Sequence, residues 1–300
     1  MGVEHEDLGA ARPWPFHART RLRGLLGWCL ASLIALAILQ AATLAEPPDD
    51  PALDSSMLLL GFQLPALLWI RRELSRTRTR AREYVGPFPA RRRVGIWTLL
   101  VLCLMGLAIA DVILAGEAVR AWDPELFSTW YEDEAMPASP YGTPQRWLAV
   151  LPILLVLVVG APVVEELVFR GVLVDVLGAR HGRAFAWICS ATIFGLLHAP
   201  NVLNAILFGL VMSALRVTSG GLLLPIALHA ANNVLPGLLV LLELGGAGQV
   251  SASDGAGGAS VVLGLVLLAL CLPLPLRVIA TGWRRAAAED AERASAPGEQ

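Results

Sequence analysis

The sequence contains no lysine, so all of its 23 basic residues are arginines. Charged residues make up only 16% of the 300 residues, hydrophobic residues make up 56%, and the mean hydropathy is +0.62. So few charges exclude an ordinary soluble globular protein, because this chain is too apolar for one. The composition is typical of a polytopic membrane protein. The missing lysine, with many Ala, Gly and Leu residues, suggests a GC-rich bacterial genome.

Cysteine is also scarce, and its positions exclude two kinds of site. The four cysteines, Cys29, Cys103, Cys189 and Cys271, all lie inside apolar runs, which favours buried free thiols over disulfides or a metal cluster. A cleavable signal peptide is not expected either. The first apolar run, residues 24–45, is long enough to span a membrane and is not followed by a small-residue cleavage site.

Apolar runs predict an all-α polytopic membrane protein with about eight transmembrane helices. They cover residues 24–45, 57–70, 94–119, 147–177, 184–199, 202–215, 222–244 and 259–279. Nine arginines between residues 71 and 93 place that loop in the cytoplasm by the positive-inside rule. Both termini are therefore expected in the cytoplasm of a bacterial cell, with the protein in its inner membrane.

The predicted helices divide the chain into parts with different roles. The parts are a cytoplasmic N-terminal tail (1–23), accessory helices with the basic loop 71–93 (24–146), a catalytic core (147–245), an outer loop with the last helix (246–283) and a cytoplasmic tail (284–300). The last 15 residues are polar and are expected to be disordered. Neither an internal repeat nor a soluble domain is visible.

One stretch, Ala161–Gly171 (APVVEELVFRG), places ionisable residues inside an apolar run. An ionisable group at membrane depth costs roughly 3 kcal/mol or more, so it is a functional-site hypothesis by default. Glu166 and Arg170 are four residues apart, with the acid first, and are predicted to pair on one helix face. Glu165 is rotated from that pair by about 100°, which leaves a lone carboxylate free to face a cavity. Asp175 is interpreted as a helix-end or solvated group.

Two histidines follow on later predicted helices. His198 lies four residues after Phe194, which we interpret as a packing residue. His229 lies four residues before Asn233 on one helix face, with Asn232 as the alternative inward-facing amide. At about 1.5 Å rise per residue, His198 falls nearer the outer face than His229, so helix tilt or a kink must bring them together.

A carboxylate, two imidazoles and an amide are sufficient for hydrolysis. The carboxylate and one imidazole can activate water, while the second imidazole and the amide can stabilise an oxyanion. The motifs EExxxR at 165–170, FxxxH at 194–198 and HxxxN at 229–233 resemble, in this order, those of the CPBP family. This family comprises CAAX-type prenyl proteases and bacteriocin-processing or immunity (Abi-like) membrane proteins.

The resemblance implies an intramembrane endopeptidase of the glutamic type, with its site inside the bundle of the fourth, fifth and seventh helices. The implied catalytic residues are Glu165, His198, His229 and Asn233, supported by Glu166 and Arg170. Glu165 and His198 would activate water, and His229 and Asn233 would bind the oxyanion. The expected partners are the lipid bilayer and a membrane-associated or exported protein or peptide, with no nucleic acid.

Two alternatives follow from the same residues. Glu165, His198 and His229 could hold zinc as a two-histidine, one-carboxylate site. The sequence has no compact motif such as HExxH, so no cofactor is expected and zinc is the alternative. The competing function is a non-catalytic immunity or scaffold protein, or a proton-coupled transporter with Glu165 as its relay. The lack of internal repeats argues against transport.

Overall fold

The structure is a computed structural model, and it describes residues 23–28, 30–32, 34, 59–87, 94–129, 154–198, 201–244 and 258–295. Every regular element in these ranges is helical, which confirms the all-α fold class. Most of the first predicted helix, and the beginning of the fourth, lie outside the described residues.

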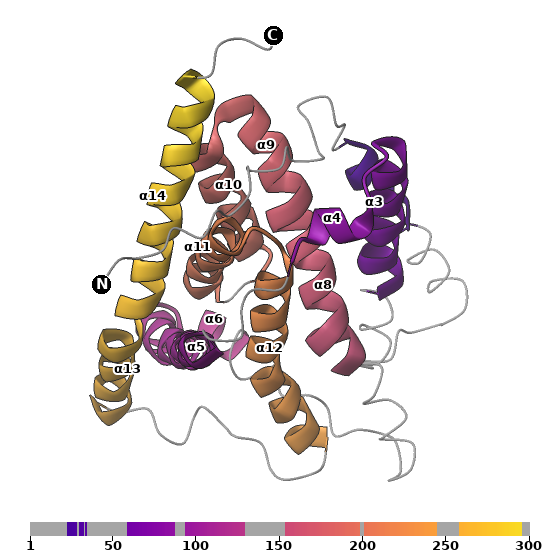
Figure 1. Cartoon of the computed structure of the whole chain (residues 1–300). Helices are drawn as coiled ribbons and strands as arrows, with labels where there is room; N and C mark the ends of the chain where they lie inside the picture. The colour runs from indigo at the N-terminus through magenta and orange to yellow at the C-terminus, as the bar shows by residue number, and fades with distance from the viewer. Residues whose placement is uncertain are drawn as a thin grey trace.

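The α-helices are labelled in Figure 1, and η denotes a π-helix, which the figure does not label. The helices are η1 (Leu59–Gln63), α3 (Leu64–Arg76), α4 (Ala81–Val85), α5 (Val94–Trp122), α6 (Pro124–Phe127), η4 (Leu155–Gly160), α8 (Ala161–Glu165), η5 (Glu166–Leu173), α9 (Val174–His181), α10 (Arg183–Leu196), α11 (Val202–Ser219), α12 (Leu223–Leu244), α13 (Gly258–Cys271) and α14 (Pro273–Ser295).

Three stretches in the described residues are long and apolar enough to cross a membrane. They are Val94–Trp122, Val202–Ser219 and Ser260–Glu292. Shorter apolar helices cover Arg183–Leu196 and Leu223–Leu238. The apolar runs thus predicted helices correctly in these regions, and the total of eight spans stays a prediction.

A segmented helix, formed by η4, α8, η5 and α9, runs through the bundle from residue 155 to 181. The sequence predicted one helix here, and the structure adds two π-helical stretches to it. Pro162 has no backbone N–H and cannot make the α-helical bond to residue 158. The wider π turn ends at Gly160, two residues before this proline, where the regular bonding pattern is interrupted.

The segmented helix lies between two flanks of the bundle. In Figure 1, α14 runs along one side and α3 lies on the other, with α8 to α12 between them. Gly182 has φ +84°, a conformation that glycine adopts without steric cost, and it lets α9 turn directly into α10. As a result, α10 packs against both α9 and α11.

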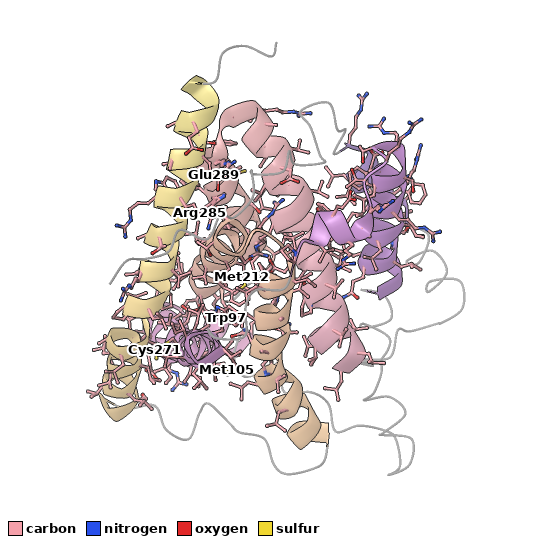
Figure 2. The ribbon with its side chains drawn as sticks, in the orientation of Figure 1. Trp97, Met105, Met212, Cys271, Arg285 and Glu289 are labelled. Carbon is pink, nitrogen blue, oxygen red and sulfur yellow. The ribbon has the colours of Figure 1, made fainter. Side chains whose placement is uncertain are left out.

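The main hydrophobic core surrounds the segmented helix. Its fully buried members include Val172 of η5 and both Val211 and Met212 of α11. Figure 2 labels Met212 in the interior of the bundle. Phe169 and Phe194 belong to the same core, and their rings meet edge to face at 5.2 Å. Apolar packing therefore extends to the residues that precede His198.

The basic loop predicted at residues 71–93 contains the end of α3 and the short helix α4. Figure 1 shows α4 between α3 and the segmented helix. The backbone N–H of Leu222 donates to the Val85 carbonyl at 2.6 Å. Gly86 (φ +79°) and Gly221 meet so closely that a Cβ on either would lie 3.0 Å or less from the other backbone. This approach holds α4 against the start of α12.

The C-terminal region differs from the prediction in two ways. The predicted helix 259–279 is divided at Leu272, because Pro273 cannot donate the next backbone hydrogen bond. The tail was expected to be disordered, and this is wrong up to Ser295, where α14 ends. Arg183 of α10 forms ion pairs with Glu289 and with Asp290, the second at 3.1 Å. These tertiary contacts, near the labelled Glu289 in Figure 2, hold the polar end of α14.

Candidate active site

Glu165 lies at the junction of α8 and η5, between two imidazole rings. Its Oε2 atom is 3.8 Å from Nε2 of His198 and 3.7 Å from Nε2 of His229. Both separations exceed hydrogen-bond length, and this buried oxygen has no hydrogen-bond partner among the described residues. Three of the four predicted catalytic side chains therefore converge on one point, despite the depths estimated from the sequence.

His198 stands in the turn directly after α10, and its ring is held on two sides. Its Nδ1 lies 2.7 Å from the backbone carbonyl of Phe194. A carbonyl oxygen only accepts, so Nδ1 carries the hydrogen and Nε2 faces Glu165. The Phe194 ring stacks on the imidazole with a centroid distance of 4.1 Å and an angle of 28°. The side chain of His198 is 39% exposed, so water or substrate can reach it.

Glu166 is fully buried, and one of its carboxylate oxygens contacts both Arg170 and His229. Its Oε1 atom is 3.0 Å from Nη1 of Arg170, so the pairing predicted from their spacing is confirmed. The same oxygen is 2.8 Å from Nδ1 of His229, a contact that the sequence did not predict. His229 thus lies between two carboxylates, with Nδ1 on Glu166 and Nε2 towards Glu165.

Arg170 is buried among aromatic rings. Its guanidinium lies 4.2 Å from the ring centre of Phe194 and 6.0 Å from that of Phe208, in the range of cation–π attraction. A Cβ at Gly209 would lie 3.1 Å from Nη2 of Arg170, so this glycine leaves room for the guanidinium. Phe194, interpreted from the sequence as a packing residue, supports both Arg170 and His198.

Asn233 has a different environment from the other three predicted residues. Its Nδ2 donates to the Leu157 carbonyl of η4 at 3.0 Å and so ties α12 to the segmented helix. It lies one turn after His229, and its amide carries a second hydrogen. The alternative, Asn232, has a buried Oδ1 with no hydrogen-bond partner in the described part of the chain.

Side-chain hydroxyls reach the backbone of η5 from other helices. The Tyr84 hydroxyl of α4 donates to the Leu167 carbonyl at 3.0 Å. The Ser190 hydroxyl of α10 donates to the Phe169 carbonyl, also at 3.0 Å. Neither residue was singled out in the sequence, because a lone Tyr or Ser carries no motif.

Arg216 of α11 binds the same backbone and was also missed. Its Nη1 donates to the Arg170 carbonyl and, at 3.3 Å, to the Gly171 carbonyl. Its Nη2 lies 2.7 Å from Oδ1 of Asp175, which is 2% exposed. The interpretation of Asp175 as a solvated group is therefore wrong. The available signal was an acid inside one apolar run and an arginine directly at the end of another, each of which needs a partner.

The described residues contain no group of three or more His, Cys, Asp and Glu side chains that could hold a metal ion. The described cysteines, Cys103, Cys189 and Cys271, are free thiols. Cys29 lies outside the described residues.

Comparison with known proteins places this site inside a recognised segment. The family model for Rce1-like proteins, "Type II CAAX prenyl endopeptidase Rce1-like", matches residues 147–235. An Escherichia coli protein named "Uncharacterized 24.3 kDa protein" is 29% identical over 170 residues, which cover 53% of this chain and 71% of the relative. No solved structure matches the chain. The matched segment contains every residue predicted for the site, and the resemblance seen in the motifs is confirmed.

Proposed function

We propose that the chain is an intramembrane endopeptidase that uses a water molecule held by Glu165 and His198, because residues 147–235 match the family model of Rce1-like CAAX prenyl endopeptidases. The substrate is a membrane-associated or exported protein or peptide. The protein acts in the bacterial inner membrane with both termini in the cytoplasm.

Reporter fusions at the two termini would test that orientation, and a signal from the outer side of the membrane at either end would contradict it.

The observation that carries this proposal is the position of Glu165 Oε2 between two Nε2 atoms, at 3.7 and 3.8 Å. These separations are too long for direct hydrogen bonds. One water molecule at about 2.8 Å from Oε2 can bridge it to the Nε2 atom of either histidine. A buried carboxylate oxygen without a hydrogen-bond partner supports the presence of such a water.

Hydrogen-bond partners assign different roles to the two imidazoles. Oε1 of Glu166 lies 3.0 Å from Nη1 of Arg170 and 2.8 Å from Nδ1 of His229. This contact orients the His229 ring so that Nε2 faces Glu165 and the position of the reacting carbonyl. In His198 the Phe194 carbonyl accepts from Nδ1, which leaves Nε2 as a proton acceptor.

The reaction then proceeds by general base catalysis. Glu165 and His198 accept hydrogen bonds from the water and remove one proton as its oxygen attacks the carbonyl carbon of the peptide bond. The oxyanion accepts from Nε2–H of His229 and from the second amide hydrogen of Asn233. The proton passes to the leaving nitrogen as the C–N bond breaks, which leaves a carboxylic acid and an amine.

Comparative membrane proteomics tests this function in the cell. Wild-type and Glu165→Gln strains are compared for protein termini present only in the wild type. An endopeptidase produces at least one such terminus, together with accumulation of the uncut precursor in the variant. A scaffold, immunity protein or transporter leaves the set of termini unchanged, and that result would overturn the proposal.

Asn233→Ala is expected to lower kcat about 100- to 1000-fold, the usual loss when one oxyanion donor is removed. The measurement is turnover of an internally quenched farnesylated CAAX peptide by the purified protein in vesicles. Asn232→Ala is the matched control and should keep turnover within a few-fold of the wild type. Equal losses in the two variants would argue for a shared packing role and against oxyanion binding by Asn233.

Metal removal is expected to leave turnover unchanged, because water activation is assigned to Glu165 and His198. Purified protein is treated with a strong chelator, its metal content is measured, and turnover of the same peptide is followed. Activity that falls on chelation and returns with added zinc would replace this mechanism with a metal-dependent one.

A further inference from the structure

We infer that Tyr84, Ser190 and Arg216 are positioning residues, which fix the catalytic carboxylates by binding the backbone carbonyls of η5. This inference rests on the proposed function, since it concerns the same site. The three side chains, here called the carbonyl clasp, come from α4, α10 and α11. No two of them lie on the same helix, yet all three donate to one eight-residue stretch.

The π-helical backbone of η5 is the part of the site that these donors bind. In a π-helix the bonds run from residue i to i+5, and such wide turns are rare and are frequently found at functional sites. A carbonyl oxygen has two lone pairs, so a buried carbonyl can accept from a side chain in addition to a backbone N–H. The clasp supplies side-chain donors to Leu167, Phe169, Arg170 and Gly171, all within η5, and the Phe169 and Gly171 carbonyls also accept from the backbone N–H of Val174.

The clasp is directly connected to the catalytic charges. Arg216 binds the backbone carbonyl of Arg170, whose guanidinium in turn holds Glu166 at 3.0 Å. Glu166 is the first residue of η5, and Glu165 directly precedes it. A shift of the π turn therefore moves both carboxylates relative to the imidazoles. A misplacement of about 1 Å at an active site can cost 100-fold in rate.

Tyr84 is built into this arrangement by close packing. A Cβ at residue 171 would lie less than 3.0 Å from the Tyr84 hydroxyl, so only glycine there allows the approach. Burial, and then the Asp175 carboxylate, raise the pKa of Tyr84 well above its ordinary value. The phenol thus stays protonated and remains a donor to Leu167.

A positioning role and a purely structural role predict different kinetics. If the clasp only stabilises the fold, its loss lowers the fraction of folded enzyme and leaves kcat per folded molecule unchanged. If it positions the carboxylates, kcat falls while KM stays nearly constant, because the interaction matters most in the transition state. The kcat and KM of folded, purified variants separate the two roles.

Tyr84→Phe and Ser190→Ala each remove one hydroxyl and little else. Each is expected to lower kcat about 3- to 10-fold with KM unchanged, the effect of losing one net hydrogen bond. The probe is the quenched farnesylated peptide in vesicles. The matched control is Ser213→Ala, which deletes a buried hydroxyl that bonds the Gly209 carbonyl at 2.9 Å within α11. It should keep the wild-type kcat.

Arg216→Gln is expected to lower kcat about 100-fold, because the Arg170 and Gly171 carbonyls of η5 lose their side-chain donor. Arg216→Lys keeps the charge beside Asp175 and should recover part of that loss. Arg183→Gln is the matched control, since Arg183 is also a buried arginine but pairs with carboxylates of α14. It should lower stability without lowering kcat of the folded protein.

Hydrogen exchange provides a readout that does not need activity. Amides of residues 166–176 should exchange faster in Tyr84→Phe than in the wild type, and no faster in Ser213→Ala. If the wild type cleaves nothing, the proposed function fails while this exchange still tests the clasp. Unchanged exchange in Tyr84→Phe, or an unchanged kcat in the clasp variants of an active enzyme, would overturn the inference.

Discussion

Glu165→Gln is expected to abolish peptide cleavage, with a loss of at least about 1000-fold in kcat. Glutamine has nearly the same shape as glutamate but cannot take a proton from water at neutral pH. The wild-type carboxylate oxygen makes no direct hydrogen bond in the described residues, so the change removes little from the fold. Turnover of the quenched peptide and the thermal unfolding midpoint are measured on the same preparation.

His198→Ala should lower kcat about 100- to 10,000-fold, because the variant lacks the second proton acceptor. His198 is partly exposed, so its truncation should change stability little. His181→Ala is the matched control, since His181 is an exposed histidine at the end of α9. The assignment fails if Glu165→Gln and His198→Ala both retain wild-type turnover.

Arg170→Met is expected to destabilise the protein by about 3–5 kcal/mol, the largest effect on stability that the site predicts. The Arg170 side chain is 1% exposed and that of Glu166 is 0% exposed. Removing the cation leaves a buried carboxylate without its main charge partner, and methionine restores only the apolar packing of the stem. The free energy of unfolding, measured in mild detergent, checks this value.

A second substitution separates charge from packing in the Arg170 prediction. Adding Glu166→Gln removes the unpaired charge and keeps an oxygen that accepts from His229, so the double variant should be more stable than Arg170→Met alone. Arg285→Met is the control. Its i, i+4 pair with Glu289 is partly exposed and should contribute at most about 1 kcal/mol. Equal stabilities of Arg170→Met and the control would contradict the role of the buried pair.

Local sequence information was enough to predict several helices and the ion pair between Glu166 and Arg170. Long apolar runs predicted α5, α11 and α12, because burial in a membrane requires an uninterrupted apolar helix. The spacing of Glu166 and Arg170 predicted their contact, since residues four apart share a helix face.

Helix breaks and helix ends were harder to predict from the sequence. The division of the last predicted helix at Leu272 follows from Pro273, yet the extension of α14 to Ser295 depends on contacts with Arg183.

The sequence by itself determined the helical character of the described residues, the resemblance of residues 147–235 to CAAX-type proteases, and which ionisable residues lie inside the apolar segments. Those properties follow from residue order, because hydropathy and helical spacing act over a few turns of one chain segment. Only the tertiary structure decided that His198 and His229 reach Glu165, that His229 also holds Glu166, and that Arg216 and Tyr84 bind the π turn. These contacts join helices far apart in sequence, so they depend on how the helices pack.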